Sequence, residues 1–71
     1  TNKFTIYLEK VKGDVDLSLF DMSGRPAFNQ LLKPSKNIIE ETIDVSDLTK
    51  GTYVLYLRSG DSLKAFKVVV Q

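Results

Sequence analysis

Apolar and polar residues alternate along most of this chain, and a period of two is typical of β-strands with one buried face. The alternation runs through Phe4–Leu8, stops around Gly13, and resumes in Val15–Phe20. Four later segments of similar length are also predicted to be strands, over residues 26–32, 38–45, 53–57 and 63–70. The apolar positions do not follow the helical period of about 3.6 residues, so the pattern predicts strands joined by turns.

In three of the later segments, the residue types predict where the strand lies in the sheet or which face it buries. Pro26 begins the third strand, and proline is confined to edge strands because it cannot donate a hydrogen bond to a neighbour. Residues 53–57 are apolar on both faces, which predicts a central strand covered on both sides. In the last strand, Phe66, Val68 and Val70 are expected to face the core. The chain is therefore predicted to be all-β, a small antiparallel immunoglobulin-like β-sandwich of about six to seven strands.

The clearest turn lies between the second and third strands, in the segment Asp21–Arg25. An aspartate at the first position of a type I turn accepts hydrogen bonds from backbone N–H groups of the turn. Gly24 then supplies the left-handed conformation that closes a hairpin with a bulge. The sequence predicts such a hairpin here.

The stretch from Ile43 to Gly60 organises the second half of the chain. The spacing of Leu48, Gly51 and Tyr53 is typical of a tyrosine corner, in which the tyrosine hydroxyl donates to backbone a few residues upstream. Leu48 is expected to fill the end of the core, and Gly51 to take a positive φ or to allow a close passage of the chain. The alternative is a turn glycine followed by a buried aromatic residue. Neither arrangement is catalytic.

One acidic residue conflicts with the alternation. Glu41 lies on the same predicted face as Ile39 and Ile43. Burial of a carboxylate is costly, so a bulge or an open sheet end is expected at Glu41. Glu40 and Glu41 do not make a catalytic carboxylate pair, because adjacent residues of a strand point to opposite faces.

Composition limits both stability and function. With 71 residues the chain is predicted to be one small domain, spanning residues 1–71, or a fragment of something larger. A chain of this size buries only about 60% of its unfolded surface. Cysteine and histidine are absent, so there is no disulfide, no zinc site and no Ser/His/Asp or Cys/His catalytic set. Stability must come from the apolar core, to which 42% of the residues are available.

Charge and hydropathy exclude further classes. The formal net charge is +1 and the lysines are scattered from Lys3 to Lys67, which does not suit a nucleic-acid surface. No apolar run approaches the roughly 20 residues of a membrane span. Asp14, Asp16 and Asp21 are too few and too irregular for an EF-hand calcium loop. We therefore expect no catalytic, cofactor-binding or metal-binding residue.

Three segments, taken in order, resemble the type A C-terminal sorting domain of the type IX secretion system. Residues 20–25 resemble its "DxxGR" hairpin, and residues 43–55 resemble its "idvs-L-GtYvl" segment. Residues 66–71 are similar to its terminal strand, where a lysine precedes β-branched residues. The family usually opens with an Asn-Pro segment just before the first strand, whereas this sequence begins with Thr1-Asn2-Lys3, as a trimmed or cleaved domain would.

The resemblance implies a non-catalytic signal domain at the C-terminus of a larger secreted protein of Bacteroidota-type bacteria. The cargo, an N-terminal domain on the same chain, would reach the periplasm by its own signal. An outer-membrane translocon would recognise the sandwich, and a cell-surface sortase would remove it. No cofactor is implied. The recognised residues would lie in the hairpin turn, the corner and the last strand, where strand addition to an exposed edge would suit recognition: Asp21, Gly24, Arg25, Leu48, Gly51, Tyr53, Lys64, Lys67, Val68, Val69, Val70 and Gln71.

Two other functions are open to a sandwich of this size. An adhesive or carbohydrate-binding module of a surface protein would need exposed aromatic side chains, and Tyr7, Phe20 and Tyr56 are the candidates on faces opposite the core. A passive spacer between domains would need no site, but it does not suit a chain that ends at its last strand.

Overall fold

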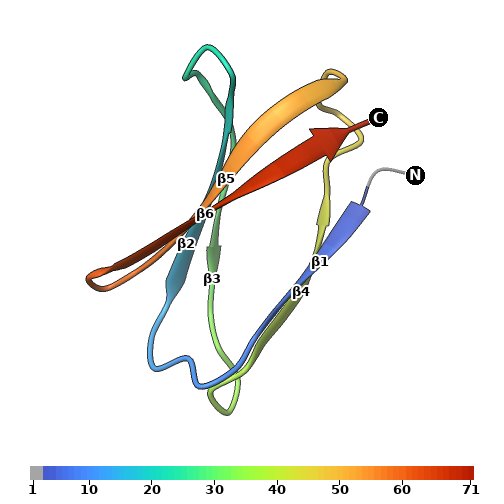
Figure 1. Ribbon diagram of the computed structural model, residues 1–71. Helices are drawn as coiled ribbons and strands as arrows, with labels where there is room; N and C mark the ends of the chain where they lie inside the picture. The colour runs from blue at the N-terminus through green and yellow to red at the C-terminus, as the bar shows by residue number, and fades with distance from the viewer. Residues whose placement is uncertain (1–2) are drawn as a thin grey trace.

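The computed structural model describes residues 3–71 and contains six antiparallel strands and no helix within them (Figure 1). The strands are β1 (Lys3–Leu8), β2 (Val15–Asp21), β3 (Pro26–Leu32), β4 (Ile39–Asp44), β5 (Gly51–Ser59) and β6 (Ser62–Val70). The all-β sandwich predicted from the alternation is confirmed. Thr1 and Asn2, which belong to the predicted domain, lie outside the described residues.

The strands form two sheets of unequal size. β1 and β4 make a two-stranded sheet, and the larger sheet has the order β3-β2-β5-β6. β3 therefore lies at an edge, as Pro26 predicted, and β5 lies between β2 and β6 as a central strand. The two-stranded sheet packs over one face of the larger sheet (Figure 1), so three connections cross between the layers.

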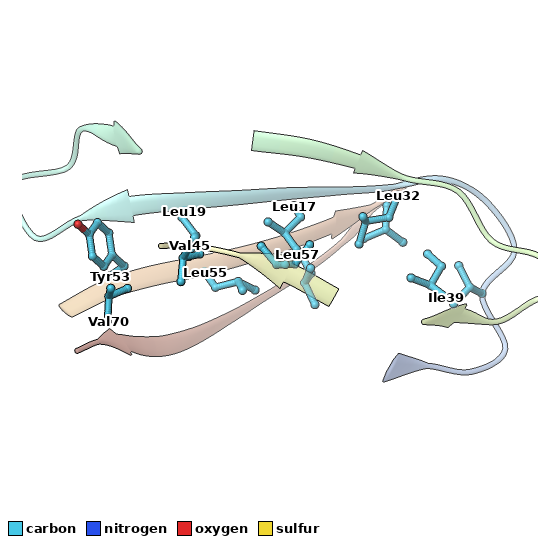
Figure 2. Close-up of a cluster of buried hydrophobic side chains, with 12 residues drawn as sticks. Leu17, Leu19, Leu32, Ile39, Val45, Tyr53, Leu55, Leu57 and Val70 are labelled. Atoms are coloured by element: carbon cyan, nitrogen blue, oxygen red, sulfur yellow. The ribbon is translucent and has the colours of Figure 1, made fainter. Parts of the chain in front are cut away.

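The core lies between these two sheets. The buried side chains come from inward positions of both sheets and from two loop residues, and they form one continuous cluster (Figure 2). Its described members are Val11, Val15, Leu17, Leu19, Leu32, Ile39, Ile43, Val45, Tyr53, Leu55, Leu57 and Val70. The strict alternation of burial along β2 and β5 shows why the sequence pattern identified these strands.

Two of the crossings between the sheets are tied to each other. The backbone N–H of Val11, in the β1–β2 connection, donates to the carbonyl of Asn37 in the β3–β4 connection at 2.8 Å. The Asn37 Nδ2 amide donates back to the carbonyl of Val11 at 2.9 Å. Val11 is also buried in the core. Val11 lies just before the point near Gly13 where the alternation stops, and it links two of the three connections between the sheets.

The third crossing ends in the predicted tyrosine corner. The Tyr53 hydroxyl donates to the backbone carbonyl of Thr49 at 2.5 Å, and the Tyr53 side chain is buried. Leu48 packs against the core, and its N–H donates to the carbonyl of Val45 at 3.0 Å. Gly51 has a φ of 152°, a value that L-residues rarely adopt. The corner is confirmed in all three of its parts.

Of the bulge or open sheet end expected at Glu41, the bulge is wrong. β1 and β4 pair in unbroken register, with Ile6 opposite Glu41. Glu41 does face the same side as Ile39 and Ile43, but it is half-buried where they are buried. Because a two-stranded sheet consists of edges alone, a carboxylate on its inner face reaches solvent without a break in the ladder.

The large sheet is less covered than the sequence indicated. Val54 and Tyr56, on the outer face of β5, are half-buried, and within residues 3–71 no second layer lies over them. In β6, Phe66 faces the core side as predicted, since it pairs with Leu55, yet it is 51% exposed. The cause is geometric, because two strands cannot cover the inner face of four.

Replacing the corner hydroxyl tests the bond at Tyr53. We expect Tyr53→Phe to lower the free energy of unfolding by about 1 kcal/mol, because it leaves the packing intact and removes one partly buried hydrogen bond. Urea denaturation followed by circular dichroism measures the loss. An unchanged denaturation midpoint would contradict a structural role for this bond.

Replacing the corner glycine tests the backbone conformation. We expect Gly51→Ala to cost about 1–3 kcal/mol, because the open space around this position leaves φ as the only source of strain. Gly13→Ala is the matched control, since Gly13 also has open space but no positive φ. A similar effect of both substitutions on thermal unfolding would show that the positive φ contributes nothing.

Candidate recognition surface

The three segments singled out in the sequence meet at one end of the large sheet. Asp21, at the end of β2, pairs with Tyr53 of β5, which pairs in turn with Val68 of β6. Gly51 pairs with Val70 near the end of the chain. Figure 1 shows the β2–β3 turn, the β4–β5 connection and the end of β6 at this end of the molecule. The structure thus brings residues far apart in the sequence to one end of the large sheet.

The β2–β3 hairpin has the predicted geometry. The N–H of Gly24 donates to the Asp21 carbonyl, and the N–H of Asp21 donates to the Arg25 carbonyl, both at 2.9 Å. Gly24 is left-handed, with a φ of 87°. The register shifts next to Phe20, which is the bulge expected of a type I turn closed by a glycine.

The Asp21 carboxylate organises this turn from within. Its Oδ1 accepts hydrogen bonds from the N–H groups of Ser23 and Arg25, each at 2.9 Å. The hydrogen bond from the Arg25 N–H is the main cause that lowers the pKa of Asp21 below its usual range. A lowered folded-state pKa means that this contribution to stability is present above the unfolded pKa and is lost as the pH falls through the folded value.

Arg25 is held in place and still accessible. Its Nε lies 3.2 Å from Oδ2 of Asp21, while 79% of its side chain is exposed. The sequence analysis did not identify the ion pair to Asp21. The two residues are four positions apart, on either side of a turn with a glycine bulge, and this spacing could have predicted the ion pair. Met22, at the tip of the same turn, is 71% exposed and was also missed.

The last strand contributes residues with different surroundings. Val70 is buried and Val68 is half-buried against the core, so both are structural. Lys67 and Val69 pair with Val54 and Thr52 on the outer face, where Val69 is 55% exposed. Lys64 pairs with Leu57 and lies toward the β5–β6 hairpin, far along the strand from the other candidates. Gln71 follows the strand and is exposed.

The aromatic candidates do not form one platform. Phe20 and Tyr56 meet on the outer face of the large sheet, with ring centroids 5.6 Å apart and ring planes at 77°. Tyr7 lies on the two-stranded sheet. Sugar rings stack on the flat faces of aromatic rings. An edge-to-face pair does not turn both ring faces to the same side, so the geometry does not favour the carbohydrate-binding alternative.

Metal-binding and membrane-spanning features were also sought. Within residues 3–71, no three acidic side chains, the aspartates considered for calcium included, gather in a way that would hold a metal ion. The same residues include no helix long and apolar enough to cross a membrane.

Comparison with known proteins agrees with the resemblance seen in the sequence. The family model described as "Secretion system C-terminal sorting domain" matches residues 1–71, the whole length of the chain. Comparison with curated proteins gave no match. The match covers the hairpin, the corner and the terminal strand, which the fold brings to one end of a sheet. The chain therefore belongs to the family of secretion system C-terminal sorting domains, the sorting signals of type IX secretion.

Proposed function

We propose that this domain directs an N-terminal cargo on the same chain through the type IX secretion system and is then removed by a sortase. Membership of the family implies a type IX secretion context and a cargo that reaches the cell surface or the extracellular space. The observation that supports the proposal is the meeting of the Asp21–Arg25 hairpin, the Tyr53 corner and the end of β6 at one end of the large sheet.

The proposed route follows from the nature of the signal. The cargo crosses the inner membrane by a separate signal, and the sorting domain folds in the periplasm. The outer-membrane translocon then reads the folded surface. A folded signal must present the same geometry on every cargo, and a sandwich whose turn and corner are fixed by internal hydrogen bonds supports that requirement.

In this proposal Arg25 is the side chain that the translocon reads. Its guanidinium is planar and offers several donors in a fixed arrangement, which suits carboxylate or backbone acceptors on a partner. The contact from Asp21 reduces the number of conformations that binding must freeze. Arg25 is thus exposed enough to bind and ordered enough to bind at low entropic cost.

The domain itself is proposed to carry no chemistry. Sorting domains of this family are generally non-catalytic. The Asp21 carboxylate is hydrogen-bonded to the backbone N–H groups of its own turn, so its role there is structural. The sortase would supply the reactive groups, and this chain would act as its substrate.

A secretion assay tests the proposal. The domain is fused to the C-terminus of a periplasmic reporter in a bacterium with a type IX system, and we expect the reporter to reach the cell surface. Arg25→Ala should reduce surface delivery severalfold, while the melting temperature changes by no more than about 4 °C, as for most surface substitutions. Cell fractionation and thermal unfolding of the purified domain measure the two effects.

Arg58→Ala is the matched control, because Arg58 is the second arginine of the chain, is also exposed, and lies toward the opposite end of β5. Arg25→Lys separates charge from shape, since lysine keeps the charge and loses the planar donors. Normal export of the Arg25→Ala fusion would remove Arg25 from the recognised surface. Retention of the unmodified fusion in the periplasm would defeat the sorting proposal.

A further inference from the structure

The inner face of the large sheet is left open beside β6. Phe66 is 51% exposed although it lies opposite Leu55, which is 2% exposed. A groove of about 260 Å³ runs here between the two sheets. Its apolar lining comes from both layers, and includes Phe4, Ile6 and Leu8 of β1 together with Leu55, Phe66 and Val68. The sandwich therefore has an apolar inner surface that the described strands leave uncovered.

The edge of β6 borders this groove. β6 has nine residues and pairs with β5 in unbroken register, and within residues 3–71 no strand pairs with its other side. The two-residue turn Gly60-Asp61 makes Ser59 and Ser62 the hydrogen-bonded pair that flanks it. Alternation along the strand then directs the backbone groups of residues 63, 65, 67 and 69 to the outer edge.

The two edges of the large sheet differ in their protection. β3 begins with Pro26 and its pairing with β2 shifts register between Pro26 and Phe28, and both features discourage the addition of another strand. β6 has neither feature. The charged residues of β6 that could discourage strand addition are Lys64 and Lys67, and the strand contains no acidic residue. An edge protected by one sign of charge rejects like strands and accepts strands of opposite charge.

Positive charge also marks one end of the groove. Toward the β5–β6 hairpin it continues into a hollow of about 310 Å³, which shares Leu8 and Leu57 with it. Lys10, Lys12 and Lys64 line this hollow, against one acidic residue, Glu9. A ligand that lies along β6 would therefore meet apolar side chains at one end and lysines at the other.

We infer that the β1–β6 groove binds an extended segment of a partner protein, which adds to β6 as an antiparallel strand. The side chains of the bound segment that face the groove are apolar opposite Val68 and Phe66 and acidic opposite Lys64. Because the segment runs antiparallel to β6, its acidic residue is C-terminal to the apolar ones. An acidic side chain also faces Lys67 on the outer face. Backbone pairing supplies affinity, and the order of apolar and acidic residues supplies specificity. The inference rests on the proposed function for its biological role, because it names the kind of segment that the β6 part of the recognised surface would bind. Its test measures binding by the isolated domain, so it can fail while the secretion assay succeeds, and the reverse.

A designed peptide tests it directly. Acetyl-TVEVTET-amide places valine opposite Val68 and Phe66, and glutamate opposite Lys67 and Lys64. Titration into the labelled 71-residue domain, followed by NMR, should give saturable shifts confined to β6 and to the groove face of β1. Hydrogen exchange should slow at the N–H groups of residues 65 and 67, which the added strand would engage.

Two methylated forms of the peptide separate strand pairing from simple adhesion. N-methylation of the glutamate opposite Lys67 removes a donor aimed at β6 and should weaken binding at least tenfold. N-methylation of the valine opposite Phe66 alters a donor that points away from β6 and should leave the affinity within about twofold. Equal effects of the two methyl groups would overturn strand addition.

Substitutions in the domain provide the matching half of the test. Phe66→Ser should abolish peptide binding, whereas Leu63→Ser, at a similarly exposed residue on the outer face, should not. Lys64→Glu should weaken binding, and a peptide with lysine opposite position 64 should restore it. Absence of saturable binding up to about 1 mM, or a failed charge exchange, would overturn the inference. Sedimentation that shows dimers joined through β6 would do the same, with a second copy as the occupant.

Discussion

The two sheets share no strand pairing within residues 3–71, so their relative position depends on side-chain packing and on the three connections between them. At one end of the sandwich, Asn37 bonds Val11 and ties two of these connections together. At the other end, the bond from Tyr53 to Thr49 holds the third. A small domain without disulfides has few other means to fix two layers, because its core alone gives marginal stability.

The corner also fixes the hairpin that we propose as the recognised feature. Tyr53 pairs directly with Asp21, and Asp21 holds the backbone and the guanidinium of Arg25. The position of Arg25 is thus linked through two neighbouring strands to the connection at Thr49. This chain of contacts explains why the motifs occur together in one sequence. The glycines permit the backbone conformations of the two turns. The side chains of Asp21 and Tyr53 hold these turns by hydrogen bonds, and Arg25 is exposed on the hairpin that results.

The strands, the hairpin and the corner were predictable because each depends on neighbours in the sequence. Alternation identifies a strand, and the aspartate and glycine of Asp21–Arg25 determine a turn type without reference to the rest of the fold. The exposure of Phe66 was not predictable, since it depends on how many strands lie in the opposite sheet. The solvent access of Glu41 was not predictable for a similar reason, because it depends on pairing with β1, which is far away in the sequence.

The unequal size of the sheets connects stability with binding. A fourth strand in the large sheet adds backbone hydrogen bonds but leaves an inner face that β1 and β4 cannot cover. Phe66 and Val68 remain near the edge of the core, where burial by a partner would recover part of the hydrophobic free energy that folding leaves unused. Side-chain recognition at the Arg25 hairpin and backbone recognition along β6 would then use different parts of the same sheet. A partner that engages both would bind a folded domain and discriminate against an unfolded one, because the unfolded chain keeps the residues but loses their arrangement.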